Sequence, residues 1–551
     1  MPNRNFVLSC AASVIAGLTA CGGDGGSVSV PAPPITTPPP PAVQPPVNLP
    51  PRFADTEVRI SGTTPFTVGC VTGGGVVYRN SEVEPQVAVN PRDPGNIVVT
   101  WQQDRWSTGG ASGIVTAAST DGGTTWTQAA FPVSRCGGGN SGNGGDYGRA
   151  TDPWVTFGPT GVVYQMALAF EGNSLQPGSR SAMLVARSTD GGRTWSAATP
   201  LITSDSSFFN DKNTITADPT DPNFVYATWD RLALAGGGPA LMARTTDGGA
   251  SWEAARVIFD PGPQSQTIGN QIVVLPNGTL VNFFTQLDSG PNNTQVATIR
   301  LIRSTDGGSS WSAPVTVAGV TALGARDPAT QPLIRDGSFV PAVTVAPNGT
   351  LWVAWQDARF SGVVDGIALA RSNDGGLTWS APVQVNSEHA VAAFTPTVRV
   401  RADGTIAVMY YDLRSNTADP ATLPTELILA RSSDAINWTE SRVTDTFDLD
   451  TAPLAGGAYF LGDYQGLEAA GNVFIPVYVR TTGDLQNRTD VFTLQARSIA
   501  AAASGARFTA STAAAKPSEE LLSRASEHIE RVMEQRIPGW KRWRAGVVQP
   551  R

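Results

Sequence analysis

Four segments of this chain pair an acidic residue with an arginine shortly after a large aromatic residue. The pairs are Asp104-Arg105, Asp230-Arg231, Asp357 with Arg359, and Asp412 with Arg414, following Trp101, Trp229, Trp355 and Tyr411, and Tyr478 with Arg480 repeats the pattern without the acid. Arginine donates paired hydrogen bonds to an oxyanion, and a carboxylate can move protons. Together these groups could bind and process an anionic substrate. Because the pattern repeats, the favoured interpretation is an ion pair that locks neighbouring repeats.

A second feature, the phrase Ser-Thr-Asp-Gly-Gly-x-Thr-Trp, shows which elements must position these residues. Its six aspartates, spaced 57 to 69 residues apart, are Asp121, Asp190, Asp247, Asp306, Asp374 and, in a degenerate copy, Asp434. A fixed period of this length indicates a repeat architecture. A carboxylate before a Gly-Gly pair accepts backbone N–H bonds and fixes a hairpin turn. Six dispersed copies cannot converge on one substrate, so we interpret these aspartates as structural.

The repeat is about 50 residues long and parses into four strands, A to D, with Asn-Gly and Asp-Gly-Gly turns. The seven copies start near Glu84, Asp152, Asp211, Asn270, Val340, Thr395 and Asp463. The last copy lacks a D strand, and a strand-like segment at 56–61 precedes the first. We therefore predict an all-β, seven-bladed propeller over residues 54–503, closed by that N-terminal strand. Six blades plus a separate unit is the alternative.

The strand directions sort the connections onto two faces. The A–B and C–D turns, including the Asp phrases, lie on one face, here named the Asp-box face. The B–C loops and D–A links lie on the other, the long-loop face, where we expect the functional site because loops on a rigid scaffold carry binding residues. Long links there contain Asp146, Tyr147, Arg326, Arg335 and Glu388.

Composition narrows the function classes. The chain has 58 glycines, 42 prolines and 15% charged residues, which suits short strands and tight turns. A net charge of −8 does not indicate the basic surface that nucleic-acid binding uses. No metal site is indicated by the two histidines, although Asp445, Asp448 and Asp450 could ligate Ca²⁺ through oxygen. We expect no cofactor and a monomer.

Residues 1–53 have the features of a segment for export and membrane anchoring. Residues 1–20 have the build of a signal peptide, and Leu18-Thr-Ala-Cys21 resembles the lipobox of bacterial lipoproteins, in which the cysteine is lipidated. A plain secretory signal cut near Ala20 is the alternative. Residues 21–53 include eleven prolines between 31 and 51 and form an extended tether. These features predict an outer-membrane lipoprotein of the bacterial envelope, facing the periplasm or the cell surface.

Two further expectations concern the remaining cysteines and the C-terminus. Cys70 and Cys136 flank the first repeat on the long-loop face, and an even pair in an oxidising compartment predicts a disulfide. Residues 504–551 form a linker, an amphipathic helix over 518–535 with Leu522, Ala525 and Ile529 on its apolar stripe, and a basic, aromatic tail.

The Asp phrase, with five near-perfect copies, is similar to the Asp-box (BNR repeat) of sialidase-type propellers. The resemblance implies three arginines that hold a sugar carboxylate, a tyrosine nucleophile assisted by a glutamate, and an aspartate acid/base. Tyr464 stands where that tyrosine falls, flanked by Asp463 and Glu468, and Asp104 or Asp146 would be the acid/base. The first arginine is replaced by Glu84, which reverses the charge.

Two hypotheses follow from this resemblance. The protein is either a glycoside hydrolase of exo-α-sialidase type, with Arg105, Arg231, Arg359, Arg414 and Arg480 binding substrate, or a non-catalytic propeller that binds a glycan or an envelope protein. The acid at position 84 favours the second, and the charged strand ends keep the first open.

Overall fold

The computed structural model describes residues 49–70, 73–289, 294–417, 419–495, 505–512, 516–536 and 540. The expected signal peptide, the lipidation site at Cys21, the tether as far as residue 48 and most of the basic tail lie outside these residues. All described elements belong to one compact unit, Val47–Arg551.

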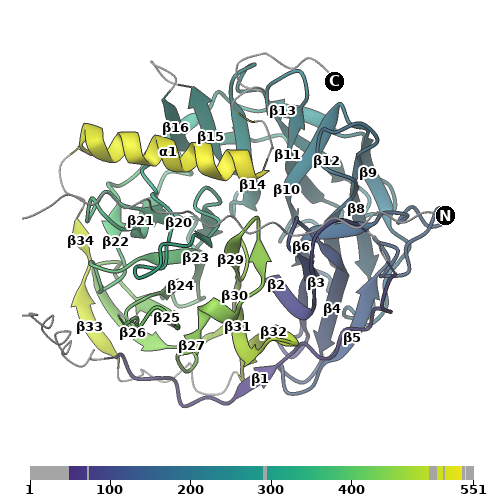
Figure 1. Ribbon diagram of the computed structural model, residues 1–551. Coiled ribbons are helices and arrows are strands. Elements are labelled where there is room, and N and C mark those ends of the chain that lie inside the picture. Colours follow the sequence, from purple (N-terminus) through teal and green to yellow (C-terminus); the bar gives the residue numbers. More distant parts are fainter. Residues whose placement is uncertain are drawn as a thin grey trace, which may run out of the picture. The chain divides into compact units, whose positions relative to one another are not determined.

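The described strands form successive antiparallel up-and-down groups, here called blades (Figure 1). The first blade contains β2 (Val77–Val89), β3 (Ile97–Trp106), β4 (Ala111–Ser119) and β5 (Thr127–Phe131). The next contains β6 (Arg149–Phe157), β7 (Val163–Glu171), β8 (Arg180–Ser188) and β9 (Thr199–Ser204). It is followed by β10 (Phe208–Ala217), β11 (Val225–Ala233), β12 (Ala240–Thr245) and β13 (Arg256–Phe259), and by β14 (Gln266–Val274), β15 (Leu280–Ser289), β16 (Gln295–Ser304) and β17 (Val315–Val320).

The second half of the chain continues the pattern with shorter outer strands. One blade contains β19 (Ala342–Val345), β20 (Leu351–Asp357), β21 (Gly366–Ser372) and β22 (Val383–Gln384). The next contains β23 (Ala393–Val400), β24 (Ile406–Asp412), β25 (Pro424–Ser432) and β26 (Asn437–Arg442). The last contains β30 (Gly466–Ala470), β31 (Val473–Asp484) and β32 (Asn487–Leu494). The inner strands touch in the order β2, β6, β10, β14, β19, β23, β30 and back to β2, which closes a propeller.

Segments from the N-terminal and C-terminal parts of the chain add strands to the outer edges of three blades. The N-terminal strand β1 (Glu57–Arg59) pairs antiparallel with β32, so the predicted closure of the last blade is confirmed. From the C-terminal side, β33 (Ala506–Thr509) adds to β26 and β34 (Ser511–Thr512) adds to β22. These two strands, which the sequence did not predict, cover edges that would otherwise stay open.

Short elements cover the centre of the long-loop face. The strand β18 (Ile334–Arg335) pairs with β29 (Ala458–Phe460), which pairs with β28 (Leu454–Ala455), while β27 (Phe447–Asp448) and the 3-10 turn η2 (Leu449–Thr451) lie beside β25 and β31.

The C-terminal helix α1 (Glu519–Arg536) packs against β16 and lies across the blades in Figure 1. Its buried side chains include Leu521, Ala525, Ile529 and Met533. The sequence predicted Leu522 on this stripe, but Leu522 is 46% exposed, because Leu521 faces the blades instead. Among the described residues, no helix is both long enough and apolar enough to span a bilayer.

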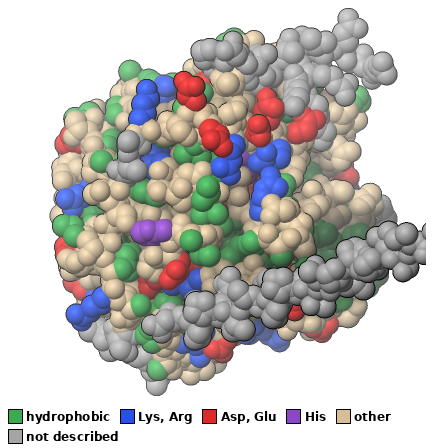
Figure 2. Space-filling model, turned by 60° about the vertical axis from the view of Figure 1, so that its left-hand side comes forward, with side chains coloured by type: hydrophobic (Ala, Val, Ile, Leu, Met, Phe, Trp, Pro, Cys, Tyr) green, Lys and Arg blue, Asp and Glu red, His purple; other side chains and the backbone are tan. Residues whose placement is uncertain are grey.

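The core consists of buried aliphatic and aromatic side chains between adjacent blades. On the surface drawn in Figure 2, acidic and basic side chains are interspersed and form no broad field of one sign. This face therefore offers no electrostatic platform for a polyanion.

Candidate functional site

The inner strands carry β-bulges at matching positions near the propeller axis. Pairing registers shift within β2, β6, β10, β14 and β23. At four of these bulges a non-glycine residue adopts a positive φ: Glu84 (55°), Asp152 (51°), Lys212 (47°) and Thr395 (50°). A bulge redirects a side chain, and positive φ is costly for residues other than glycine, so this repeated feature marks a specialised position.

The bulges assemble a buried group of charges, here named the axial cluster: Glu84, Asp152, Lys212, Arg335 and Asp463. Lys212 Nζ lies 2.6 Å from Asp463 Oδ2, 3.3 Å from Asp152 Oδ1 and 3.8 Å from Glu84 Oε1. Arg335 Nε donates to Asp463 Oδ1 at 3.0 Å. Since the three acids and Lys212 are almost fully buried, each charge depends on the others for compensation.

The shared environment shifts the pKa values of the three acids of the cluster in different directions. Burial raises the pKa of Glu84 to about 8, against the opposing pull of Lys212. Burial would raise the pKa of Asp152 too, but Lys212 and a hydrogen bond with Glu84 hold it below its ordinary value. Burial of Asp463 is outweighed by Arg335 and Lys212, which lower its pKa. The pKa of Glu84 is therefore raised while those of Asp152 and Asp463 are lowered, so Glu84 is the acid of the cluster that holds a proton most readily.

Tyr464, the residue expected as a nucleophile, lies beside this cluster. Its hydroxyl donates to the carbonyl oxygen of Pro153 at 3.0 Å, and its ring meets the Trp154 ring edge-on at 5.2 Å. Burial, followed by the charges of the three acids of the cluster, raises its pKa well above 10. Glu468, its expected helper, instead pairs with Arg399, whose Nε lies 2.6 Å from Glu468 Oε1.

An axial cavity of about 690 Å³ lies below the cluster. Side chains from alternate positions of the inner strands line it: Gln86, Trp154, Thr156, Lys212, Thr216, Gln271, Thr397, Arg399, Tyr464 and Glu468. Its walls continue to the A–B turns at Asn90–Arg92, Pro159, Pro219 and Gly471. The cavity therefore extends to the Asp-box face, and not to the long-loop face where we expected the site.

On the long-loop side the cluster is covered. A cavity of only about 90 Å³ separates Lys212, Arg335 and Asp463 from residues of α1, among them Arg536. Arg536 Nε lies 2.5 Å from Asp211 Oδ2, which ties the end of α1 to β10.

The five arginines predicted to bind substrate do not converge on Tyr464. Arg359 pairs with Asp357, Arg414 with Asp412 and Glu440, and Arg480 with Glu57. The two members of each pair belong to one blade. The Asp357–Arg359 pair also contacts the preceding blade, as the sequence suggested, because Arg359 donates to the Gly319 carbonyl oxygen and Asp357 accepts from Thr321. Buried Arg105 lies over the Phe460 ring at 4.5 Å and donates to Gln102 Oε1 at 2.7 Å, and Arg231 lies over Phe208 at 4.4 Å.

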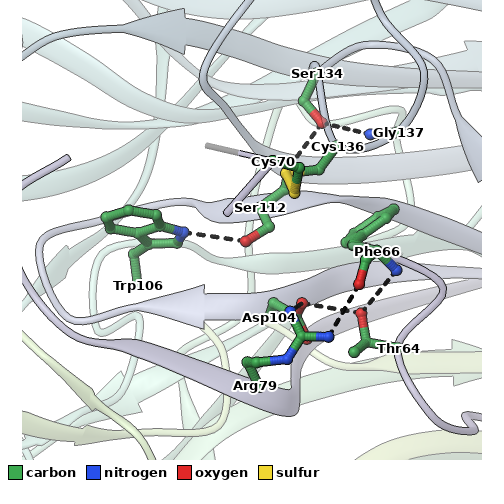
Figure 3. The surroundings of a disulfide bond; sticks show 10 residues. All are labelled: Thr64, Phe66, Cys70, Arg79, Asp104, Trp106, Ser112, Ser134, Cys136 and Gly137. Carbon is green, nitrogen blue, oxygen red and sulfur yellow. Dashed lines mark hydrogen bonds and ion pairs between the residues drawn. A yellow bond between two sulfur atoms is a disulfide. The ribbon is translucent and has the colours of Figure 1, made fainter. Parts of the chain in front are cut away.

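The two aspartates considered as acid/base lie in other surroundings. Asp104 accepts from Thr64 Oγ1 and from the Asn80 backbone N–H, each at 2.9 Å, near the disulfide (Figure 3). Asp146 is half-exposed and pairs with Arg135 at 2.7 Å. Neither aspartate lines the axial cavity.

The Cys70–Cys136 disulfide is present, as predicted, with a Cα–Cα distance of 5.2 Å. Figure 3 shows it close to Ser112 and Ser134. Ser134 Oγ donates to the Ser112 carbonyl oxygen at 2.7 Å and accepts from the Gly137 N–H at 3.2 Å. The disulfide joins the segment before β2 to the loop after β5.

The Asp-box geometry agrees with the structural interpretation. Asp121 Oδ1 accepts from the backbone N–H groups of Thr124 and Thr125 at 3.0 and 2.9 Å, and Oδ2 accepts from Thr125 Oγ1 at 2.6 Å. These bonds lower its pKa to about 2. The same carboxylate-to-turn bonding recurs at Asp190, Asp247, Asp306, Asp374 and Asp434.

The expected Ca²⁺ ligands are engaged in protein contacts. Asp445 pairs with Arg52 at 3.4 Å, and Asp448 Oδ1 accepts from the Leu423 N–H at 2.7 Å. Within the described ranges, no group of three His, Cys, Asp or Glu residues is arranged to hold a metal ion.

The sequence reasoning missed Lys212 and Trp154 as members of the site, whereas it named Arg335 among the link residues of the long-loop face. A signal for Lys212 was available, because it occupies the same place in its repeat as Glu84 and Asp152 do in theirs. Reading that one position across the repeats would have brought the three residues together. Arg335 lies in a link that does not recur in the other repeats, so no repeat pattern could place it next to Asp463.

Comparison with known proteins matches residues 239–456 to the model of a BNR repeat-like domain. No curated protein matches. Among solved structures, an α-L-arabinanase of Penicillium chrysogenum complexed with arabinobiose is similar at 17% identity and a TM-score of 0.43, covering 64% of this chain and 93% of that one. A Dyadobacter fermentans protein of unknown function has 16% identity, a TM-score of 0.42 and coverages of 77% and 98%. A Trypanosoma rangeli sialidase in complex with sialic acid has 14% identity, a TM-score of 0.36 and coverages of 63% and 54%.

The closed ring of inner strands, the Asp-box turns and the matched region together define the class: this chain is a β-propeller with a BNR repeat-like region. Similarity at this level does not transfer an activity, so function has to be argued from the chain's own site.

Proposed function

We propose that this protein is a seven-bladed propeller that binds a neutral part of a glycan in its axial cavity. One observation carries the proposal: a cavity with both polar and apolar walls extends to the surface, while the charges at its closed end pair with one another. The raised pKa of Glu84 favours its neutral form, and Lys212 and Arg335 pair with Asp152 and Asp463. The two cations of the cluster are therefore already paired with its own acids, which leaves them unavailable to a sugar carboxylate.

The chemistry of the cavity lining suits an uncharged sugar. Trp154 and Tyr464 offer aromatic surface, while Gln86, Gln271 and Thr397 offer amide and hydroxyl groups. A volume of about 690 Å³ falls within the range that small-ligand pockets commonly have. Arg399 and Glu468 form an internal pair on the wall, so they add no net charge.

A glycan array probed with the mature protein tests this function, followed by titration of the best neutral hit. We expect Trp154→Ala to weaken binding at least tenfold, because it removes the main aromatic wall. Leu485→Ala, at an exposed hairpin position away from the cavity, is the control and should bind normally. Unchanged binding by a folded Trp154→Ala protein would refute the axial site.

A second candidate function is glycoside hydrolysis, favoured by the separated pKa values of Glu84 and Asp152. A protonated acid beside an anionic one is the arrangement that acid/base catalysis uses. In this candidate Tyr464 remains the nucleophile, and Glu84 takes the acid role first considered for Asp104 or Asp146. Turnover of fluorogenic sialosides and neutral glycosides, lost in both Tyr464→Phe and Glu84→Gln, would support it. No turnover of any of them would leave the binding function alone.

We also propose that the protein is a monomeric envelope lipoprotein anchored through Cys21. The lipobox-like sequence and the proline-rich tether support this proposal. Cys21→Ser should move the protein from the membrane fraction to the soluble fraction, and retention in the membrane would contradict the anchor.

A further inference from the structure

A groove separate from the axial cavity lies where the β6–β9 and β10–β13 blades meet. It has a volume of about 610 Å³ and is lined by Tyr147, Arg180, Ile202, Thr203, Ser204, Asp205, Phe208 and Arg231. We name it the arginine groove. It shares no lining residue with the axial cavity.

A polar network beneath the groove fixes its walls. Asn210 Nδ2 donates to Ser204 Oγ at 3.0 Å and to Ser181 Oγ at 3.2 Å. Trp229 Nε1 donates to Asn210 Oδ1 at 3.1 Å. Because Asn210 thereby ties β8, β9, β10 and β11 together, the residues that flank it are held in fixed positions.

Two arginines present their edges in this groove. The guanidinium carbon of Arg231 lies 4.4 Å from the centre of the Phe208 ring, and that of Arg180 lies 4.6 Å from the centre of the Tyr147 ring. Stacking on a ring uses the face of the guanidinium and leaves its in-plane N–H groups available to donate. Arg180 already uses Nη2 on the Asp146 carbonyl oxygen, whereas the guanidinium of Arg231 has no acceptor among the described residues. Two such forks suit the paired oxygens of a carboxylate or a sulfate.

The charge balance of the groove leaves room for an anion. In the part of the chain that the structure describes, Arg231 has no acidic partner, and its buried Nε has no acceptor. The acid next to it in sequence, Asp230, pairs with Arg536 of α1. Arg180 forms an ion pair with Asp146 at 3.7 Å, and Asp146 is shared with Arg135, so one acid serves two arginines.

The remaining acid of the groove does not neutralise these arginines. Asp205 accepts from the Ser207 backbone N–H at 2.9 Å, and no ion pair joins it to Arg180 or Arg231. Burial lowers the pKa of Arg231, and no described carboxylate offsets that cost. An oxyanion in the groove would supply the missing compensation.

We propose that the arginine groove binds an acidic sugar residue, that is, a sugar ring that carries a carboxylate or a sulfate. Arg231 holds the oxyanion, assisted by the N–H groups of Arg180 that Asp146 leaves free, and Ser204 and Thr203 offer hydroxyl groups to the ring. The site is separate from the axial cavity, so the two can be occupied and lost independently.

Calorimetric titration with an oligogalacturonate tests the proposal, with a neutral galactose oligomer of equal length as the control ligand and a sulfated oligosaccharide as the second anion. We expect the acidic oligomers to bind, and Arg231→Gln to weaken that binding at least tenfold. Arg231→Lys should also bind more weakly than the wild type, because it keeps the charge and loses the fork. Arg507→Gln, at an exposed position on β33, is the matched control and should bind normally.

Three outcomes would overturn the proposal: no binding of either acidic oligomer, equal binding of the neutral oligomer, or binding unchanged by Arg231→Gln. The two sites are distinguished by Trp154→Ala, which should leave oligogalacturonate binding intact. A failure of the axial site would therefore not be read as a failure of the groove.

Discussion

Replacing Lys212 with methionine would test the most consequential feature of the site, its buried charge balance. Lys212 Nζ lies within 4 Å of three buried carboxyl groups, and among the described residues only Asp463 forms an ion pair with a second cation, Arg335. Methionine keeps most of the side-chain volume and removes the charge, so Asp152 is left buried without a cation. Removing one partner of a buried pair costs about 3–5 kcal/mol. We expect the free energy of unfolding to fall by that amount at pH 7.

The pKa shift of Asp152 determines how the stability difference between variant and wild type should change with pH. In the wild type the pKa of Asp152 is lowered, so Asp152 contributes stability above its unfolded pKa and loses it as the pH falls. Without Lys212, burial raises that pKa, and Asp152 instead destabilises the folded state at higher pH. The difference between variant and wild type should therefore be large at pH 7 and smaller near pH 4.

Urea unfolding followed by tryptophan fluorescence measures this difference, with exposed Lys516→Met as the control. A loss below about 1 kcal/mol at pH 7, or a loss that grows as the pH falls, would refute the reasoning that these charges are buried and interdependent.

Three further predictions follow from other contacts. Glu84→Gln should remove a dependence of stability on pH. The folded pKa of Glu84 is about 8, against 4.5 ordinarily, so the free energy of unfolding of the wild type falls by up to about 1.4 kcal/mol per pH unit between those values. The variant should lack this decrease, which urea unfolding at pH 5 and pH 8 would measure. Arg244→Ala should cost about 1.5–3 kcal/mol, because Arg244 donates to the carbonyl oxygen of Gly307 in the Asp-box of the next blade; the wild-type unfolding midpoint would contradict this. The double replacement of Cys70 and Cys136 by serine should cost about 2–4 kcal/mol, measured against the wild type with and without reductant, and a variant as stable as the oxidised wild type would contradict it.

The fold could be predicted because its main signal is local. An Asp-box fixes its own turn through bonds that span four residues, such as those that Thr125 donates to Asp121, so five of its six copies keep nearly the same sequence. The closing strand β1 was predictable for a related reason: an incomplete last blade leaves an edge, and an unpaired strand precedes the first blade. Neither inference needed a long-range contact that the sequence does not display.

The site could be predicted only in part, because it depends on contacts between distant segments. Tyr464, which the sequence suggests as a nucleophile, lines the axial cavity, but its hydroxyl bonds to Pro153, from another blade, and not to Glu468. The covering of the long-loop face by α1 rests on Arg536 reaching Asp211, a pair that is 325 residues apart. No periodicity in the sequence specifies such a contact.

The charge reversal at position 84 separates the two ligand chemistries of this protein. The raised pKa of Glu84 favours its neutral form, and Lys212 and Arg335 pair with Asp152 and Asp463, so the cations of the axial cluster are already occupied by its own acids. Among the five arginines at the strand ends, Arg231 is the one that stacks on a ring without any hydrogen-bond or acidic partner among the described residues. Recognition of an anion is therefore expected at the arginine groove and recognition of an uncharged sugar at the axis. A glycan that carries both kinds of residue should lose part of its affinity in Arg231→Gln, another part in Trp154→Ala, and both parts in the double variant.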